Sequence, residues 1–88
     1  METYIVQTAR GAQADTAAAR WLDASYNSTV DQARSSLAGI FAAKHDREDR
    51  GEGYEREWLR LIEQSKTAEV GDVLSFDEFA ARIIRDVD

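Results

Sequence analysis

The sequence predicts a small α+β domain, mostly α, with an N-terminal strand or hairpin packed against three to four amphipathic helices. Residues 3–8 are rich in β-forming side chains, whereas later segments repeat their apolar residues at helical spacing. The chain contains no proline, which favours helices without interruption. Its 88 residues correspond to a single domain over 1–88.

The N-terminal segment Thr3–Thr8 is the clearest strand in the sequence. A lone strand leaves backbone donors and acceptors unpaired, so this segment needs a partner strand. Three partners would satisfy it: another copy of the chain, a target protein, or residues 18–25 folded back as a hairpin.

Residues 16–26 fit two different structures. Asp15 or Thr16 would cap a helix there, and the alanine content favours that helix. As a strand, the same residues alternate only weakly and would pair with Thr3–Thr8. We expect a helix and keep the strand as the alternative. The helical face would carry Ala18, Trp21, Leu22 and Tyr26.

Two helices are predicted in the middle of the chain, over residues 29–49 and 54–67. Thr29 and Gln32 have the spacing of a capping box at the start of the first helix. Between the two helices, glycine and mixed charges predict a charged, mobile link at 45–53.

The last predicted helix, over residues 76–87, has the most complete set of helix signals. Ser75 would cap it, and Glu78 would reach back to complete a capping box. Its apolar stripe has to be buried, so the other elements are expected to pack on it. The stripe consists of Phe76, Phe79, Ala80, Ile83, Ile84 and Val87. The predicted core is Ile5, Trp21, Leu22, Leu37, Ile40, Phe41, Trp58, Leu61, Ile62, Phe76, Phe79, Ile83 and Ile84.

Composition and motifs argue against several function classes. The chain has no cysteine, which excludes disulfides and thiolate chemistry. No apolar run approaches the roughly 20 residues of a membrane span, and the N-terminus lacks signal-peptide features. We therefore expect a cytoplasmic protein without a membrane partner.

No enzyme and no cofactor are predicted. His45 is the one histidine, and no strained nucleophile turn accompanies it. Carboxylate pairs such as Asp46 and Asp49 lie in charged surroundings that would not separate their pKa values. Residues 67–78 have the length of a calcium-binding EF-hand loop but lack its first aspartate and its central glycine, so no metal is expected.

The net charge of −6 arises entirely in the second half of the chain. Residues 1–44 hold four acidic and four basic side chains, whereas residues 45–88 hold thirteen acidic and seven basic ones. Solubility alone would account for this excess. A functional explanation is a basic partner, either a protein or a nucleic-acid-binding complex. Direct nucleic-acid binding is not expected, because no basic stripe stands clear of acidic neighbours.

The segments Glu57–Ser65 and Val73–Ile83 resemble the C-terminal, toxin-wrapping region of some bacterial antitoxins. The resemblance spans about a third of the chain and implies two acidic amphipathic helices that bind a basic toxin. In size, acidity and lack of chemistry, the chain also resembles the small anti-defence inhibitors of phages and mobile elements, such as anti-CRISPR proteins.

Our hypothesis is a non-enzymatic, antitoxin-like acidic protein that binds and inhibits or regulates a basic protein partner. One alternative is a phage or mobile-element anti-defence inhibitor, anti-CRISPR-like or a DNA mimic. A further alternative is a self-associating helical structural protein, such as a homodimer held by the 76–87 stripe. The candidate partner-binding residues are Glu48, Asp49, Glu52, Glu55, Glu63, Glu69, Asp72 and Asp77.

Overall fold

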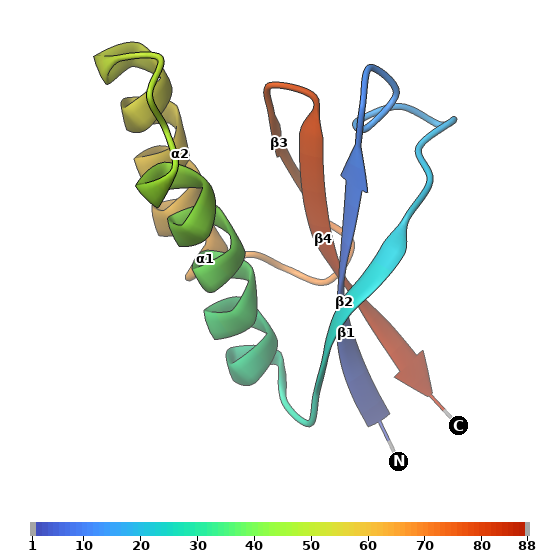
Figure 1. Ribbon diagram of the computed structural model, residues 1–88. Helices are drawn as coiled ribbons and strands as arrows, with labels where there is room; N and C mark the ends of the chain where they lie inside the picture. Colours follow the sequence, from blue (N-terminus) through green and yellow to red (C-terminus); the bar gives the residue numbers. More distant parts are fainter. Residues whose placement is uncertain (1, 88) are drawn as a thin grey trace.

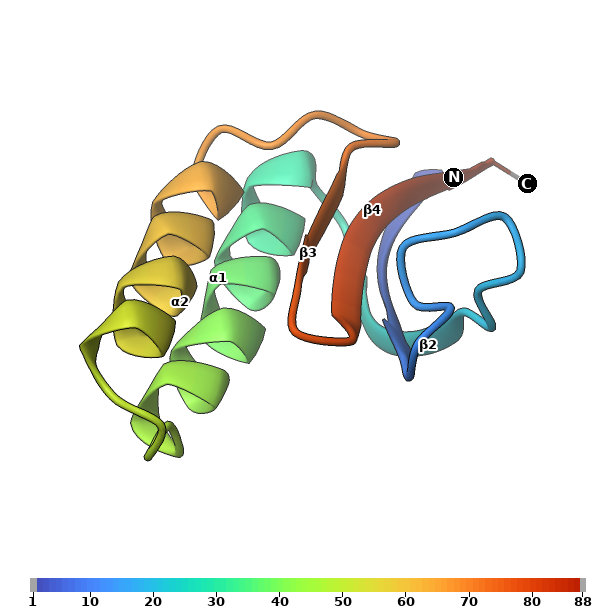
Figure 2. The same cartoon turned by 90° about the horizontal axis from the view of Figure 1, so that it is seen from above.

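Two β-hairpins build one antiparallel sheet, and a helical hairpin covers one of its faces. The computed structural model describes residues 2–87. Figures 1 and 2 show the two layers, with both helices on the same side of the sheet. The sheet order is β2-β1-β4-β3, so the first and last strands form the central pair. The elements are β1 (Glu2–Arg10), β2 (Leu22–Asn27), α1 (Val30–Asp46), α2 (Glu52–Ser65), β3 (Val73–Phe76) and β4 (Phe79–Val87).

The central strands β1 and β4 pair along their whole length, from Glu2 opposite Val87 to Arg10 opposite Phe79. Side chains alternate between the two faces of a sheet. Val6 and its neighbour Ile83 therefore face the helices and are fully buried. The next pair along, Ile5 and Ile84, faces the other side.

The predicted helix over 76–87 is wrong, because these residues belong to the hairpin β3–β4. Asp77 and Glu78 form its two-residue turn, and their φ values of 53° and 58° are those that a type I′ turn requires. Strand β4 is buried on both faces near its start, so its apolar residues do not alternate with polar ones. Such a run fits a buried strand as well as a helix.

The predicted helix over 16–26 is also wrong. Residues 11–21 form an irregular connection, and β2 pairs with β1, with Tyr26 opposite Ile5 and Leu22 opposite Thr8. The hairpin alternative for the N-terminal strand is thus the correct one, since β2 satisfies one edge of β1. Residues 2–87 form an α+β fold with four strands and two helices, and the expectation of a mostly α domain with three to four helices is wrong.

The two helices predicted in the middle of the chain are present, but α1 covers 30–46 and not 29–49, and α2 covers 52–65 and not 54–67. The Thr29 side chain accepts a hydrogen bond from the Gln32 backbone N–H at 3.1 Å, as the capping box predicts. The Gln32 side chain reaches back one residue further than expected and accepts from the Ser28 N–H at 3.0 Å. Within residues 2–87, neither helix combines the length and the hydrophobicity needed to cross a membrane.

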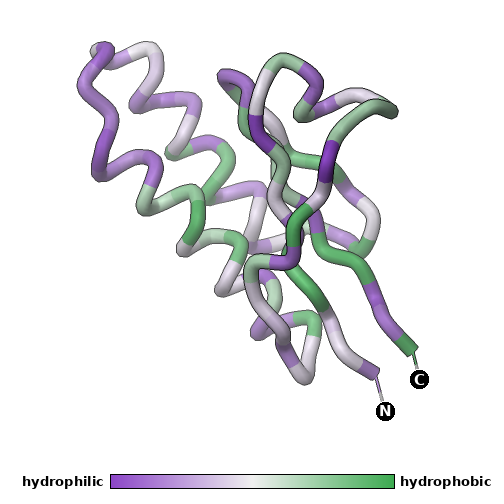
Figure 3. Tube along the Cα trace, turned by 45° about the vertical axis from the view of Figure 1, so that its right-hand side comes forward, coloured by the Kyte–Doolittle hydropathy of each residue, from purple (hydrophilic) through white to green (hydrophobic). Residues whose placement is uncertain are grey.

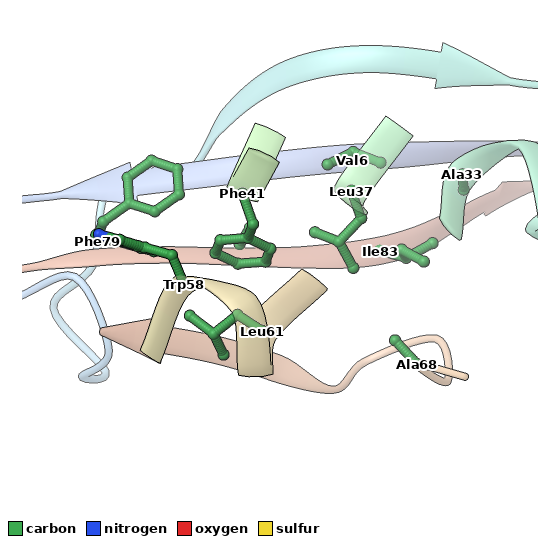
Figure 4. Packing of buried hydrophobic residues seen from close by; sticks show 10 residues of the cluster. Val6, Ala33, Leu37, Phe41, Trp58, Leu61, Ala68, Phe79 and Ile83 are labelled. Carbon is green, nitrogen blue, oxygen red and sulfur yellow. The ribbon is translucent and has the colours of Figure 1, made fainter. Parts of the chain in front are cut away.

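Aromatic rings fill the space between the helices and the sheet (Figure 4). The Phe41 ring centroid lies 6.3 Å from that of Trp58 and 5.9 Å from that of Phe79. Leu22, predicted as core, is 70% exposed because β2 is an edge strand. Trp21, Ile40, Ile62, Phe76 and Ile84 are only partly buried, and the other predicted core residues are buried.

Candidate functional site

The outer face of α2 carries three acidic side chains around one exposed leucine, next to the exposed Arg56 and Arg60. Glu52, Glu55, Leu59 and Glu63 follow one another at intervals of three or four residues, which places them on the same side of the helix. A different side of α2 carries Trp58, which is buried in the core. Leu59 remains 49% exposed. We call Glu52, Glu55, Leu59 and Glu63 the α2 stripe.

The carboxylates of the α2 stripe differ in their local partners. Glu63 pairs with Lys66, at 3.2 Å between Oε1 and Nζ. Among the described residues, Glu52 and Glu55 form no ion pair. Exposed ion pairs contribute little to stability, so the stripe is available to a partner along its whole length.

Glu48 occupies the centre of the α1–α2 connection, which forms a hydrophilic end of the molecule (Figure 3). Its side chain is 1% exposed. The carboxylate accepts hydrogen bonds from the Arg50 guanidinium at 2.8 Å and from the Trp58 indole N–H. It also accepts the backbone N–H groups of Asp49 and Arg50, at 3.1 and 3.0 Å. These bonds, with Arg50 as the main cause, lower the pKa of Glu48 to about 2.

Arg50 joins the α1–α2 connection to the β3–β4 turn, because its guanidinium also pairs with Asp77. Asp49 is exposed beside this pair. Side-chain contacts of Glu48 with Trp58 and of Arg50 with Asp77 therefore connect this link to α2 and to the second hairpin. Glu48 and Asp77 both pair with Arg50, whereas Glu52 and Glu55 form no ion pair among the described residues.

Glu69 and Asp72 lie at the other end of α2, in the turn that precedes β3. The Asp72 carboxylate accepts the Glu69 backbone N–H at 3.0 Å, which stabilises this turn. The Glu69 carboxylate lies 3.7 Å from the Arg34 guanidinium. The eight predicted partner-binding acids thus form three groups: Glu48, Asp49 and Asp77; Glu52, Glu55 and Glu63; and Glu69 and Asp72.

The sheet face away from the helices carries a hydrogen-bonded network that sequence analysis missed. The Gln7 amide donates to Asp23 at 2.8 Å, and the Tyr26 hydroxyl donates to the same carboxylate at 2.7 Å. Arg82 donates to the Gln7 oxygen at 3.0 Å and stacks over Trp21, 4.1 Å from the ring centroid. The Gln7 bond first, and then the Tyr26 bond, lower the pKa of Asp23.

This network joins β2, β1 and β4 across the sheet, and the 11–21 connection covers one end of the same face (Figure 2). Ala14 is buried there against Ala9 and Ala80. No regular spacing of polar residues in the sequence predicts this network, because its members come from three separate strands. Only the register of these strands brings the side chains together.

The described residues contain no group of three or more His, Asp or Glu side chains that could hold a metal ion. His45 lies beside Asp46, with 3.7 Å between Nδ1 and Oδ1. The chain matches no family model, no curated protein and no solved structure. The surface feature that best indicates a function is the α2 stripe.

Proposed function

We propose that this protein is a non-enzymatic binding protein that docks the α2 stripe on a basic protein partner and thereby inhibits or regulates it. The observation that carries the proposal is the half-exposed Leu59 with Glu55 and Glu63 one helical turn to either side. Interfaces commonly place an apolar anchor at their centre and charged groups at the rim. The carboxylates of Glu52 and Glu55, which form no ion pair among the described residues, would steer a basic partner towards the anchor.

The attachment of α2 to the domain supports this proposal. Trp58 and Leu61 are buried against the core, so the helix presents its outer side on a rigid base. The Glu48 hydrogen bond to the Trp58 indole also attaches the middle of α2 to the α1–α2 connection. A helix that is already formed loses little conformational freedom on binding, which favours affinity. The expected mode is an amphipathic helix docked in a groove of the partner.

Two kinds of basic partner fit the proposal: a toxin, as for antitoxins, and a nucleic-acid-binding defence complex, as for anti-CRISPR proteins. Both would meet the same stripe. Self-association through a helix over 76–87 is not proposed again, because these residues form β3 and β4 with Phe79 and Ile83 in the core.

The test is affinity capture with tagged protein from an extract of its native host, followed by binding measurements on the purified partner. Glu55→Lys and Leu59→Ser should each weaken binding about tenfold or more, because they remove a steering charge and the anchor. Asp86→Lys is the matched control, since it makes the same charge change on exposed β4. Raising the salt concentration should release the wild-type complex.

Equal binding by wild-type protein and both stripe variants would contradict the proposal. The same conclusion would follow if Asp86→Lys weakened binding as much as Glu55→Lys, because the effect would then reflect net charge alone. Circular dichroism of every variant should match the wild type, since all three positions are exposed.

A further inference from the structure

A pocket with three cationic side chains lies between the sheet and the C-terminal part of α1. It has a volume of about 230 Å³. Arg10 comes from the end of β1, Lys44 from the last turn of α1, and Arg47 from the residue that caps α1. Thr8 adds a hydroxyl, and the remaining lining is apolar: Ala24, Ile40, Ala43 and Phe79. We call this cavity the basic pocket.

The three cations of the basic pocket have no acidic partners. Among residues 2–87, Arg10, Lys44 and Arg47 form no ion pair. Lys44 and Arg47 also line the adjacent hollow that holds Glu48, Asp49 and Asp77, in which Arg50 pairs with Glu48 and with Asp77. Arg50 and the three cations of the pocket together outnumber these three carboxylates. The pocket therefore keeps a local excess of positive charge in a protein whose net charge is −6.

The helix dipole explains only part of this arrangement. Basic side chains at the carbonyl end of a helix are favourable, which accounts for Lys44 and Arg47. Arg10 belongs to the sheet and receives no such benefit. Burial first, and then the proximity of Arg10 and Arg47, lower the pKa of Lys44, because each disfavours its positive charge. A bound anion would relieve this repulsion.

An aromatic ring holds two of the cations in place. Lys44 Nζ lies 4.3 Å from the centroid of the Phe79 ring, and Arg10 Cζ lies 5.6 Å from it. The ring is itself fixed by Phe41 and by Trp58, whose ring centroid is 6.4 Å away. The charged groups are thus positioned before any ligand arrives, which reduces the entropy cost of binding.

We propose that the basic pocket binds a small anionic molecule that carries a phosphate or a carboxylate on a compact apolar body. The three cations and the Thr8 hydroxyl are suited to the anionic group, and Ile40, Ala43 and Phe79 to the apolar body. The volume is below the roughly 300–1,000 Å³ of pockets for drug-sized ligands, so the ligand is smaller. This site is independent of the α2 stripe.

An NMR titration at low salt tests the basic pocket with four probes. Phenyl phosphate and benzoate combine an anionic group with an apolar ring, whereas inorganic phosphate and benzyl alcohol each supply one of the two. We expect one or both ring-bearing anions to bind saturably, with a dissociation constant near or below about 1 mM. The shifts should centre on Arg10, Lys44, Arg47 and Phe79. Whichever of phenyl phosphate and benzoate binds more tightly identifies phosphate or carboxylate as the preferred anionic group.

Variants decide whether the cations carry the binding. Arg47→Gln and Arg10→Gln should each weaken the tighter probe about tenfold, since each removes a charged contact. Arg56→Gln, the same change on the surface of α2, should leave the affinity unchanged. If the NMR spectrum of Arg10→Gln shows that this variant does not fold, the affinity of Arg47→Gln alone tests whether the cations bind the probe. Equal weakening by Arg56→Gln, equal binding of benzyl alcohol, or no saturation by about 10 mM would each overturn the proposal.

Discussion

The α2 stripe and the basic pocket carry opposite charges and are built in opposite ways. The stripe is a local feature, because its residues lie within three turns of one helix. The pocket is a product of the fold, because β1, the end of α1 and the start of β4 have to meet before it exists. The difference teaches that net charge describes a small protein poorly. A chain of charge −6 can concentrate positive charge wherever distant segments converge.

The two regions also depend differently on the core. Leu59 is half-exposed and is not a member of the core cluster, whereas Phe79 both lines the basic pocket and belongs to the aromatic core. Changes to the core should therefore remove the pocket before they affect the local helical stripe. The following predictions test this contrast.

The largest expected effect is that of Phe79→Ala. Removal of this buried ring should lower the free energy of unfolding by about 3–5 kcal/mol. Leu59→Ala should lower it by less than about 1 kcal/mol, because the side chain is half-exposed. Urea unfolding followed by tryptophan fluorescence measures both. A similar loss for the two variants would show that the stripe is part of the core.

An acid titration should reveal the buried carboxylate that lies between the two regions. The pKa of Glu48 is about 2 in the folded protein, below its ordinary value of 4.5. The folded state therefore holds this proton less readily than the unfolded chain. Its contribution to stability is complete above pH 4.5 and is lost as the pH falls towards 2.

Glu48→Gln should flatten this acid decline, whereas Asp49→Asn at the exposed neighbouring position should preserve it. The measurement is the urea midpoint at a series of pH values between 2 and 6, on all three proteins. Identical pH profiles for wild type and Glu48→Gln would show that the Arg50 and Trp58 hydrogen bonds do not form in solution.

The smallest expected effect concerns the turn of the second hairpin. A glycine at this position should stabilise a hairpin but destabilise a helix. Glu78 has a φ of 58°, a conformation that disfavours every residue with a side chain except asparagine and aspartate. Glu78→Gly should therefore raise the free energy of unfolding by about 1 kcal/mol, seen as a higher melting temperature. Glycine in the helix expected from sequence would instead lower it by about 1 kcal/mol.

Features that depend on near neighbours in the chain were predictable from sequence. Thr29 caps α1 as its spacing indicates, and Glu52, Glu55 and Glu63 share one side of α2. The second hairpin was missed because Asp77-Glu78 lacks the Asn-Gly signature of a type I′ turn. β4 was also predicted as a helix, because Phe79, Ala80 and Ala81 are all buried and show no alternation of apolar and polar residues. The basic pocket and the Asp23 network depend on strand register, which the sequence does not state.

The central pairing of β1 with β4 has a consequence for the protein's synthesis. Val6 can pair with Ile83 only after the ribosome has made nearly the whole domain. Until then, one edge of β1 is open, and the apolar sides of α1 and α2 lack the half of the sheet that β3 and β4 provide. Chains that stop before Phe79 therefore expose both a strand edge and an apolar helical surface, two features that make incomplete chains prone to aggregation.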